Sequence, residues 1–432
     1  MTDTAFVRDG MLGPQKAPTS EVGALRWARE NLFSSLLNTA LTLGSIYAVY
    51  LFLGAVGPWL LRSVWNASSL QQCRQIVEQT NGPGVNGACF AVIRERWQQI
   101  VFGFYPRDLY WRPTLTMALM LVALAPVLFS WVPRWLLWFS FAFPAVAFWL
   151  LWGGSVWLPV TILLGFGVSY LAYRLISPLN GLLGAVSAIV LPILYWLFLC
   201  GPLEQAIYSV FPIGLHQLAS DDFGGFLLST VIGVSGIAFS LPIGVLLALG
   251  RQSDLLIVKT FCVAFIEGFR GVPLITLLFV ASLLLNYFLP PGTEFDIILR
   301  VIIMVTIFSA AYMAEVIRGG LAALPRGQYE AADALGMDYW TAQRLIVMPQ
   351  ALKVSIPGIV GNFIGLFKDT TLVSFISLQD PLQLVSSIRA NTEWNGIYWE
   401  LFIFVGALFW VFCFSMSRYS MYLERKLKTD HS

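Results

Sequence analysis

Long apolar runs separated by short polar connections make up most of this chain. The runs are about twenty residues long, which is the length that an α-helix needs to cross the hydrocarbon core of a bilayer. They do not alternate between apolar and polar residues, so helices are expected rather than the strands of a membrane barrel. We therefore expect an all-α polytopic membrane protein with about ten transmembrane helices. The expected spans lie near residues 36–61, 115–132, 135–152, 157–173, 182–200, 223–249, 272–289, 297–316, 356–373 and 398–417.

One polar segment interrupts this pattern, and it reads EAADALGMDYWTAQRLIVMPQALKVSIP. Its Ala, Glu and Leu residues predict a short helix over 330–335, and Gly336 suits the left-handed turn that ends a helix. A second helix is expected over 339–348, with Pro349 and Pro357 restricting its continuation. The segment is expected to form a helix-turn-helix ledge parallel to the membrane. Its amphipathic character indicates a partner outside the lipid rather than a solvated loop.

Lys and Arg residues in the short connections predict the orientation, because such residues gather on the cytoplasmic side. With ten spans, both termini are expected in the cytoplasm. The long loop near 62–112 is also rich in Arg but falls on the external side, where long loops have little influence on orientation. The cytoplasmic set is Arg134, Arg174, Arg251, Lys259, Arg270, Arg318, Arg326, Arg344, Lys353, Arg418, Arg425, Lys426 and Lys428.

The composition excludes most other classes of protein. The chain is 57% hydrophobic and 12% charged, which a soluble domain of this length could not keep from aggregating, and its net charge of +2 argues against nucleic acid. Its two histidines, His216 and His431, leave little for a zinc site or a His-activated nucleophile. No Gly-rich stretch ends in Gly-Lys-Ser or Gly-Lys-Thr, so no phosphate loop for ATP is expected. We expect no catalytic, cofactor-binding or metal-binding residues in this chain.

The five cysteines fall into two groups. Cys200, Cys262 and Cys413 lie in or near apolar runs and are expected to be packing residues. Cys73 and Cys89 bracket a stretch rich in Gly and Asn in the external loop, where an oxidising compartment permits a disulfide. A bridge between these two residues and a pair of free thiols both remain open.

Several motifs resemble a known family. The spacing of Glu330-Ala331-Ala332, Gly336 and Met348-Pro349 resembles the EAA signature of the permease subunits of ABC importers. Three further phrases are similar to the subgroup that imports polar amino acids of the His, Glu, Gln and Arg type: GFRGVPL at 268–274, AYMAEVIRGG at 311–320 and KDTTL at 368–372. The resemblance implies the core of a type I ABC importer permease over 223–428, with about five spans and a cytoplasmic coupling loop over 317–355.

The remaining half is similar to the long-form permeases of general L-amino acid importers. It comprises a cytoplasmic segment, 1–35, and an extension, 36–222, with about five spans and a periplasmic loop near 62–112. The segment before residue 36 lacks the basic head and apolar core of a signal peptide, so the first span is expected to be a retained anchor.

The resemblance implies a transport mechanism and a set of partners. In that family the short helix fits a groove on the ATP-binding subunit, which gives a coupling role to Glu330, Ala331, Ala332, Asp333, Leu335, Gly336 and Pro349. An ATP-binding subunit dimer would use ATP and Mg, a periplasmic binding protein would deliver an L-amino acid, and a second, related and shorter permease would complete the pathway. Transport would proceed by alternating access in the bacterial inner membrane.

Charges inside the apolar runs are costly and therefore candidates for function. Lys368 and Asp369, with the hydroxyls of Thr370 and Thr371, are expected to line or brace the translocation route near its external side. Glu315 is a second candidate, although pairing with Arg318 at helical spacing is the better interpretation. A passive channel or carrier without an ATPase partner is the alternative function, but it leaves the polar ledge without a partner.

Overall fold

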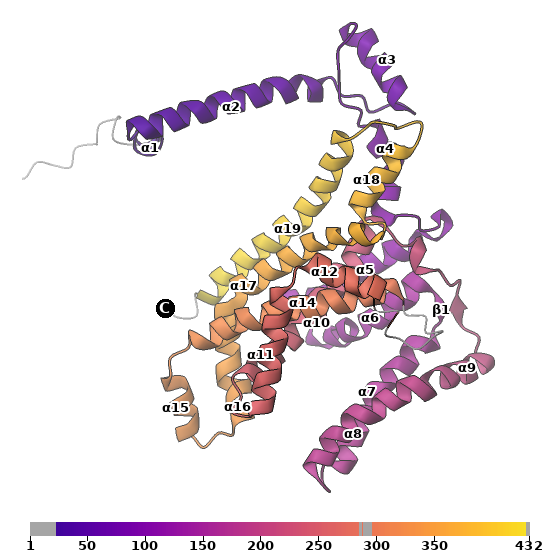
Figure 1. Ribbon diagram of the computed structural model, residues 1–432, viewed down its shortest axis with the longest axis vertical. Helices are drawn as coiled ribbons and strands as arrows, with labels where there is room; N and C mark the ends of the chain where they lie inside the picture. The colour runs from indigo at the N-terminus through magenta and orange to yellow at the C-terminus, as the bar shows by residue number, and fades with distance from the viewer. Residues whose placement is uncertain (1–22, 285–286, 288–295, 429–432) are drawn as a thin grey trace, which may run out of the picture. The chain divides into compact units, whose positions relative to one another are not determined.

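The computed structural model describes residues 23–284, 287 and 296–428 of the chain and is almost entirely helical over them (Figure 1). Nine of the described helices are long and apolar enough to cross a membrane, and one helix pair bent at a break raises the number to ten. The protein is therefore an all-α polytopic membrane protein, as predicted. The described residues divide into two compact units, with the boundary between Val92 and Ile93.

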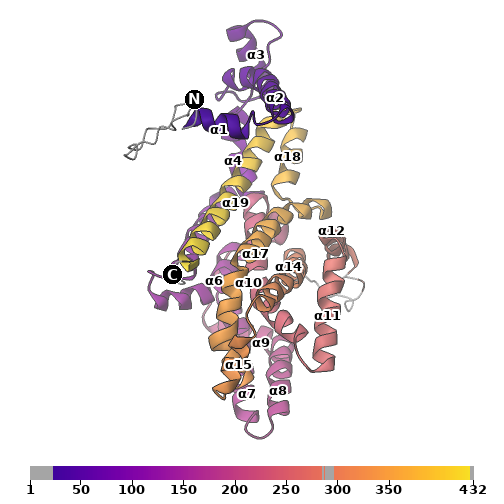
Figure 2. The same ribbon diagram turned by 90° about the vertical axis from the view of Figure 1, so that its left-hand side faces the viewer.

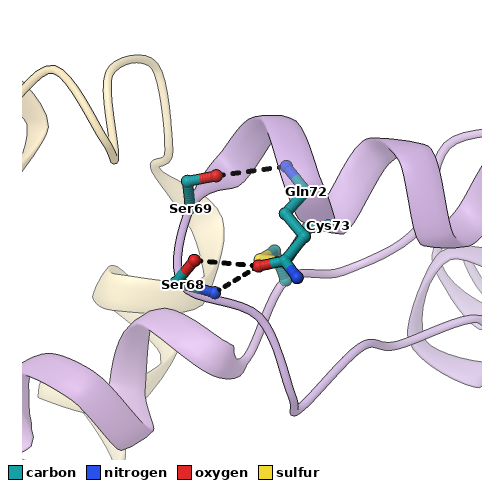
Figure 3. Close-up of a disulfide and its surroundings, with 5 residues drawn as sticks. Ser68, Ser69, Gln72 and Cys73 are labelled. Carbon is teal, nitrogen blue, oxygen red and sulfur yellow. Dashed lines mark hydrogen bonds between the residues drawn. A yellow bond between two sulfur atoms is a disulfide. The ribbon is translucent and has the colours of Figure 1, made fainter.

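The first unit contains α1 (Ala24–Asn31), α2 (Leu36–Leu61) and α3 (Leu70–Asn81). Cys73 of α3 forms a disulfide with Cys89, with their Cα atoms 5.9 Å apart, and both cysteines are buried. Figure 3 shows how α3 begins: the Ser69 hydroxyl accepts the backbone N–H of Gln72 at 3.2 Å, and the Gln72 amide oxygen accepts the backbone N–H and hydroxyl of Ser68. These contacts satisfy N–H groups that a helix start leaves free.

The second unit begins with the rest of α4 (Ala91–Phe102) and the remaining extension. Its helices are η2 (Arg107–Leu109), α5 (Trp111–Leu128), η3 (Arg134–Leu136), α6 (Leu137–Trp152), α7 (Trp157–Ile176), α8 (Gly181–Leu194), the π-helical turn η4 (Tyr195–Leu199) and α9 (Cys200–Val210). The strands β1 (Gly154–Ser155) and β2 (Gly214–Leu215) pair antiparallel, with Gly154 opposite Leu215. This pairing lies at the uncharged connection between α6 and α7, and the two helices are separate spans, as expected.

The C-terminal half of this unit contains η5 (Ser220–Asp222), α10 (Gly225–Arg251), α11 (Leu256–Gly271), α12 (Leu274–Phe279), the π-helical η6 (Val280–Leu284), α14 (Ile297–Ala322), α15 (Gly327–Ala334), α16 (Tyr339–Ala342), the π-helical η7 (Gln343–Val347), α17 (Met348–Asp369), η8 (Thr370–Ile376), α18 (Pro381–Ala390) and α19 (Trp399–Lys428). Helices α10, α14 and α17 pack against one another, and α19 lies along α17 (Figures 1 and 2).

Small residues let these helices approach closely. Gly233 faces the ring of Phe367, Gly236 faces Val305 and Leu366, and Gly244 faces Met313, so a methyl group at any of the three would be crowded. Such close approach is how helices associate in lipid, where the hydrophobic effect contributes little between them.

The span expected over 272–289 is wrong. A helix, α11, already occupies 256–271, and the chain then bends by 100° into α12 and η6. Pro273 lacks an N–H and disfavours helical backbone at the residue before it, and Val272 is accordingly extended. The charges of α11 made it resemble a polar connection in the sequence. Residues 285–286 and 288–289 of the expected span lie outside the described residues.

The expected end of the second ledge helix near Pro349 and Pro357 is also wrong. The helix beginning at Tyr339 continues through η7 into α17 and η8 as one span, 339–376. Pro349 occupies the first turn of α17, and Pro357 lies within that helix. Proline is tolerated in membrane helices because neighbouring groups satisfy the carbonyl that it frees. The ledge is therefore one short helix and a turn, followed by the start of a long span.

Candidate functional site

Helix α15 and the turn that follows it form a compact projection between the span that ends with α14 and the span that begins at Tyr339. Helix α15 is followed by Gly336, whose φ of 69° is the left-handed conformation that glycine adopts without strain. Asp338 then caps α16 by accepting the backbone N–H and the hydroxyl of Thr341. These bonds hold the pKa of Asp338 below its usual value. The turn and the following helix start are thus fixed by local chemistry.

One face of this projection is anchored to the membrane helices. Ala332 is buried, and Tyr329 packs against the cluster that includes Ile317 and Ala351. The side-chain amide of Gln350 in α17 donates a hydrogen bond to the Gln328 side chain at 2.9 Å. These contacts connect α15 directly to α17.

The other face is exposed. Glu330, Ala331 and Asp333 of α15 are exposed, as are Gly336 and Pro349. Leu335, just after α15, is 72% exposed, and Trp340, at the start of the next span, is 66% exposed. Exposed apolar side chains beside carboxylates are typical of a surface that another protein covers. We call the exposed residues of 330–340 the docking surface. It contains the coupling residues predicted from the sequence, apart from Pro349 and the buried Ala332.

Glu315 lies at the centre of a second group of charges. One of its carboxylate oxygens accepts hydrogen bonds from Arg318 at 2.6 and 2.8 Å, which confirms the predicted pairing. Its other oxygen lies 3.2 Å from Arg251 and 3.8 Å from Arg270. Glu267 joins the group at 2.9 Å from Arg251 and 3.8 Å from Arg270. Sequence reasoning missed this assembly because its members come from three helices.

The four residues proposed for the translocation route do not share one environment. Lys368 is exposed and Asp369 is half-buried. Thr370 is buried and its hydroxyl donates to the carbonyl of Phe367 at 2.8 Å, while the hydroxyl of Thr371 donates to the carbonyl of Lys368 at 2.9 Å. The two hydroxyls thus bond to the preceding helical turn.

Within the described residues, no group of three or more His, Cys, Asp or Glu is placed to hold a metal ion. Cys200, Cys262 and Cys413 are free and buried, as expected for packing residues.

Comparison with known proteins places the chain in a family. Residues 240–429 match the family described as binding-protein-dependent transport system inner membrane component. The chain is 60% identical, over its whole length and the whole length of the relative, to the glutamate/glutamine/aspartate/asparagine transport system permease protein BztC of Rhodobacter capsulatus. The chain belongs to this family of ABC importer permeases. The permease is also 36% identical to the inner membrane amino-acid ABC transporter permease protein YhdY of Escherichia coli, over 97% of each chain.

A shorter relative matches only about half of the permease. The glutamate/aspartate import permease protein GltK of Escherichia coli O6:H1 is 33% identical over 208 residues, which make up 91% of that protein but 47% of this permease. The two relatives of full length cover the extension as well. The permease is thus of the long form, in which a membrane-spanning extension accompanies the family core.

Proposed function

We propose that this permease moves L-amino acids, with broad or polar specificity, from the periplasm to the cytoplasm. The names of the relatives support the substrate class, since each refers to amino acids or to Glu, Gln, Asp or Asn. The observation that carries the proposal is the docking surface, where α15 and the Gly336 turn expose Leu335 between two spans and Trp340 is exposed at the start of the second of them. A passive channel would have no use for such a surface.

The partners follow from the same surface. An ATP-binding subunit dimer covers residues 330–340, uses ATP and Mg, and carries its closure to α17 through the Gln328–Gln350 contact. A periplasmic binding protein delivers the amino acid, and a second, related and shorter permease completes the pathway. This chain itself binds no cofactor.

The orientation follows from the docking surface, which must face the ATP-binding subunits. Residues 327–340 then lie in the cytoplasm of the bacterial cell, as do both termini under a count of ten spans. The segment containing the Cys73–Cys89 disulfide lies in the periplasm, where such bonds persist.

Lys368 and Asp369 line the translocation route, with Thr370 and Thr371 bracing the helix end. An exposed lysine within an apolar span is too costly to face lipid and must meet either water or another subunit. The double variant Lys368→Met, Asp369→Asn tests this role in an uptake assay with radiolabelled glutamate. Loss of uptake with intact assembly is expected, and normal uptake removes these residues from the route.

The test of the main proposal is co-purification with the ATP-binding subunit of the same importer. The natural chain is compared with the variant Glu330→Lys, Gly336→Trp, which alters the charge and the turn of the docking surface. Capture by the natural chain and loss in the variant are expected. Capture by neither chain, together with uptake that continues after ATP depletion, would favour the passive channel.

A further inference from the structure

Five charged side chains meet where three core helices approach one another. Arg251 ends α10, Glu267 and Arg270 lie in the last turns of α11, and Glu315 and Arg318 lie in α14. The Glu315 carboxylate is the common acceptor, with one oxygen bound by Arg318 and the other by Arg251 and Arg270. The Arg270 guanidinium also lies 5.5 Å from the ring of Tyr312 in α14.

This group differs from an ordinary surface ion pair. The Glu315 side chain is 21% exposed and those of Arg251 and Arg270 are 24% and 30% exposed, so water screens them only in part. Removing one charge from a poorly solvated group leaves the opposite charges unpaired, which destabilises the fold. Removal of Glu315 should cost most, because its carboxylate pairs with all three arginines, whereas that of Glu267 pairs with two.

The group lies between two other features of the fold, the α11–α12 bend and the chain segment that leads to α15. Arg270 is followed at once by Gly271 and then by the 100° bend between α11 and α12. Glu315 and Arg318 lie in the last turns of α14, which ends at Ala322. Helix α15 begins five residues later, at Gly327, and leads into the docking surface. The ion group is therefore the polar link between the bend and the helix that leads to α15.

We propose that these five residues form a transmission joint that connects the docking surface to the α11–α12 bend, with Glu315 as its central positioning residue. The inference rests on the proposed function, since it requires an ATP-binding subunit that moves α15. When α14 moves with α15, the carboxylate of Glu315 draws Arg270 and the end of α11 with it. The angle of the α11–α12 bend then changes when the docking surface moves, and the two sites are thereby coupled.

The test uses the full complex with its ATP-binding subunits in lipid vesicles and compares the natural chain with Glu315→Gln. This substitution keeps the shape of the side chain and removes its charge. Two quantities are measured: capture of the ATP-binding subunit, and the number of glutamate molecules imported per ATP hydrolysed. Glu393→Gln is the matched control, because its carboxylate is exposed and pairs with Arg96 at 3.4 Å away from the joint.

Capture should be unchanged in Glu315→Gln, while import per ATP should fall by about 5-fold to 150-fold, the range of ordinary coupling between sites. Import per ATP should stay normal in Glu393→Gln. Normal import per ATP in an assembled Glu315→Gln complex would overturn the joint. Failure of the natural chain to capture any ATP-binding subunit would instead overturn the proposed function, and the joint with it.

A second variant covers the case in which Glu315→Gln does not assemble. Glu267→Gln removes a carboxylate that is 53% exposed, so a smaller effect on folding is expected. Import per ATP in this variant should be lower than in the control but higher than in Glu315→Gln. Equality with the control in this assembled variant would also overturn the joint.

Discussion

Two adjacent glycines near the end of α14 offer a sharp test of how the core is packed. Gly320 is buried against α17, whereas Gly319 is exposed on the same helix. A Cβ atom at Gly320 would lie 2.6 Å from the carbonyl oxygen of Ala351 and would also meet the hydroxyl of Ser355. A Cβ atom at Gly319 would have no neighbour within 4 Å among the described residues. Alanine at the two positions therefore differs in packing and in little else.

The size of the effect follows from these contacts. Ser355 can rotate away, but the Ala351 carbonyl belongs to the backbone of α17, so the helices must separate by about 0.8 Å to restore an ordinary contact. Such overpacking costs about 1–3 kcal/mol. Replacing a glycine inside a helix by alanine gains about 0.5–1 kcal/mol. That gain applies to both variants and cancels when they are compared.

The assay is reversible unfolding of the purified full chain in detergent micelles, with the natural protein alongside. Gly319→Ala should be as stable as the natural chain or slightly more stable. Gly320→Ala should be less stable than Gly319→Ala by about 1–3 kcal/mol. Because Gly320 lies between Glu315 and the docking surface, import per ATP should fall in Gly320→Ala as well. Equal stability of the two variants would refute the close approach of α14 and α17.

Two further predictions concern the segments outside the spans. Burial raises the pKa of Asp380 to about 6, so between its usual pKa of 3.8 and about 6 the folded protein binds more protons there than the unfolded chain and loses stability as pH rises. Asp380→Asn should therefore raise the stability measured in unfolding curves at a pH above this window and have little effect below it. By contrast, the pKa of the capping residue Asp338 is lowered, so Asp338→Asn should destabilise the protein at neutral pH. Denatured, unreduced protein should bind a thiol label at three cysteines, and at all five only after reduction; labelling of Cys73 or Cys89 without reductant would contradict the disulfide.

The sequence predicted features that depend on neighbouring residues. The apolar runs located most of the spans, and the helical spacing of Glu315 and Arg318 indicated their ion pair, which the structure confirms. The Ala, Glu and Leu residues of 330–335 predicted a short helix and Gly336 a left-handed turn after it, and both are present. Each of these signals lies within a few turns of one helix, where the periodicity of the helix determines which side chains meet.

Features that depend on distant residues were missed. The charges of α11 are accommodated because Arg251 and Glu315 meet them from α10 and α14, and no periodicity within α11 reveals those partners. The sequence therefore indicated a polar connection where the structure has a helix. Asp380 was missed for the same reason, since its burial depends on the packing around α18 rather than on its neighbours in the chain.

The extension is bound to the core by aromatic contacts that neither half reveals alone. Trp152 of the extension stacks on Phe223 with ring centroids 4.3 Å apart, and Tyr105 meets the same ring edge-on at 5.6 Å. Phe223 is 1% exposed, and Gly103 pairs with it through a backbone bridge. A core cut at residue 223 would expose this ring and lose its packing partners. The core of the long-form permease is thus completed by its extension, and it is not equivalent to a short permease with added helices.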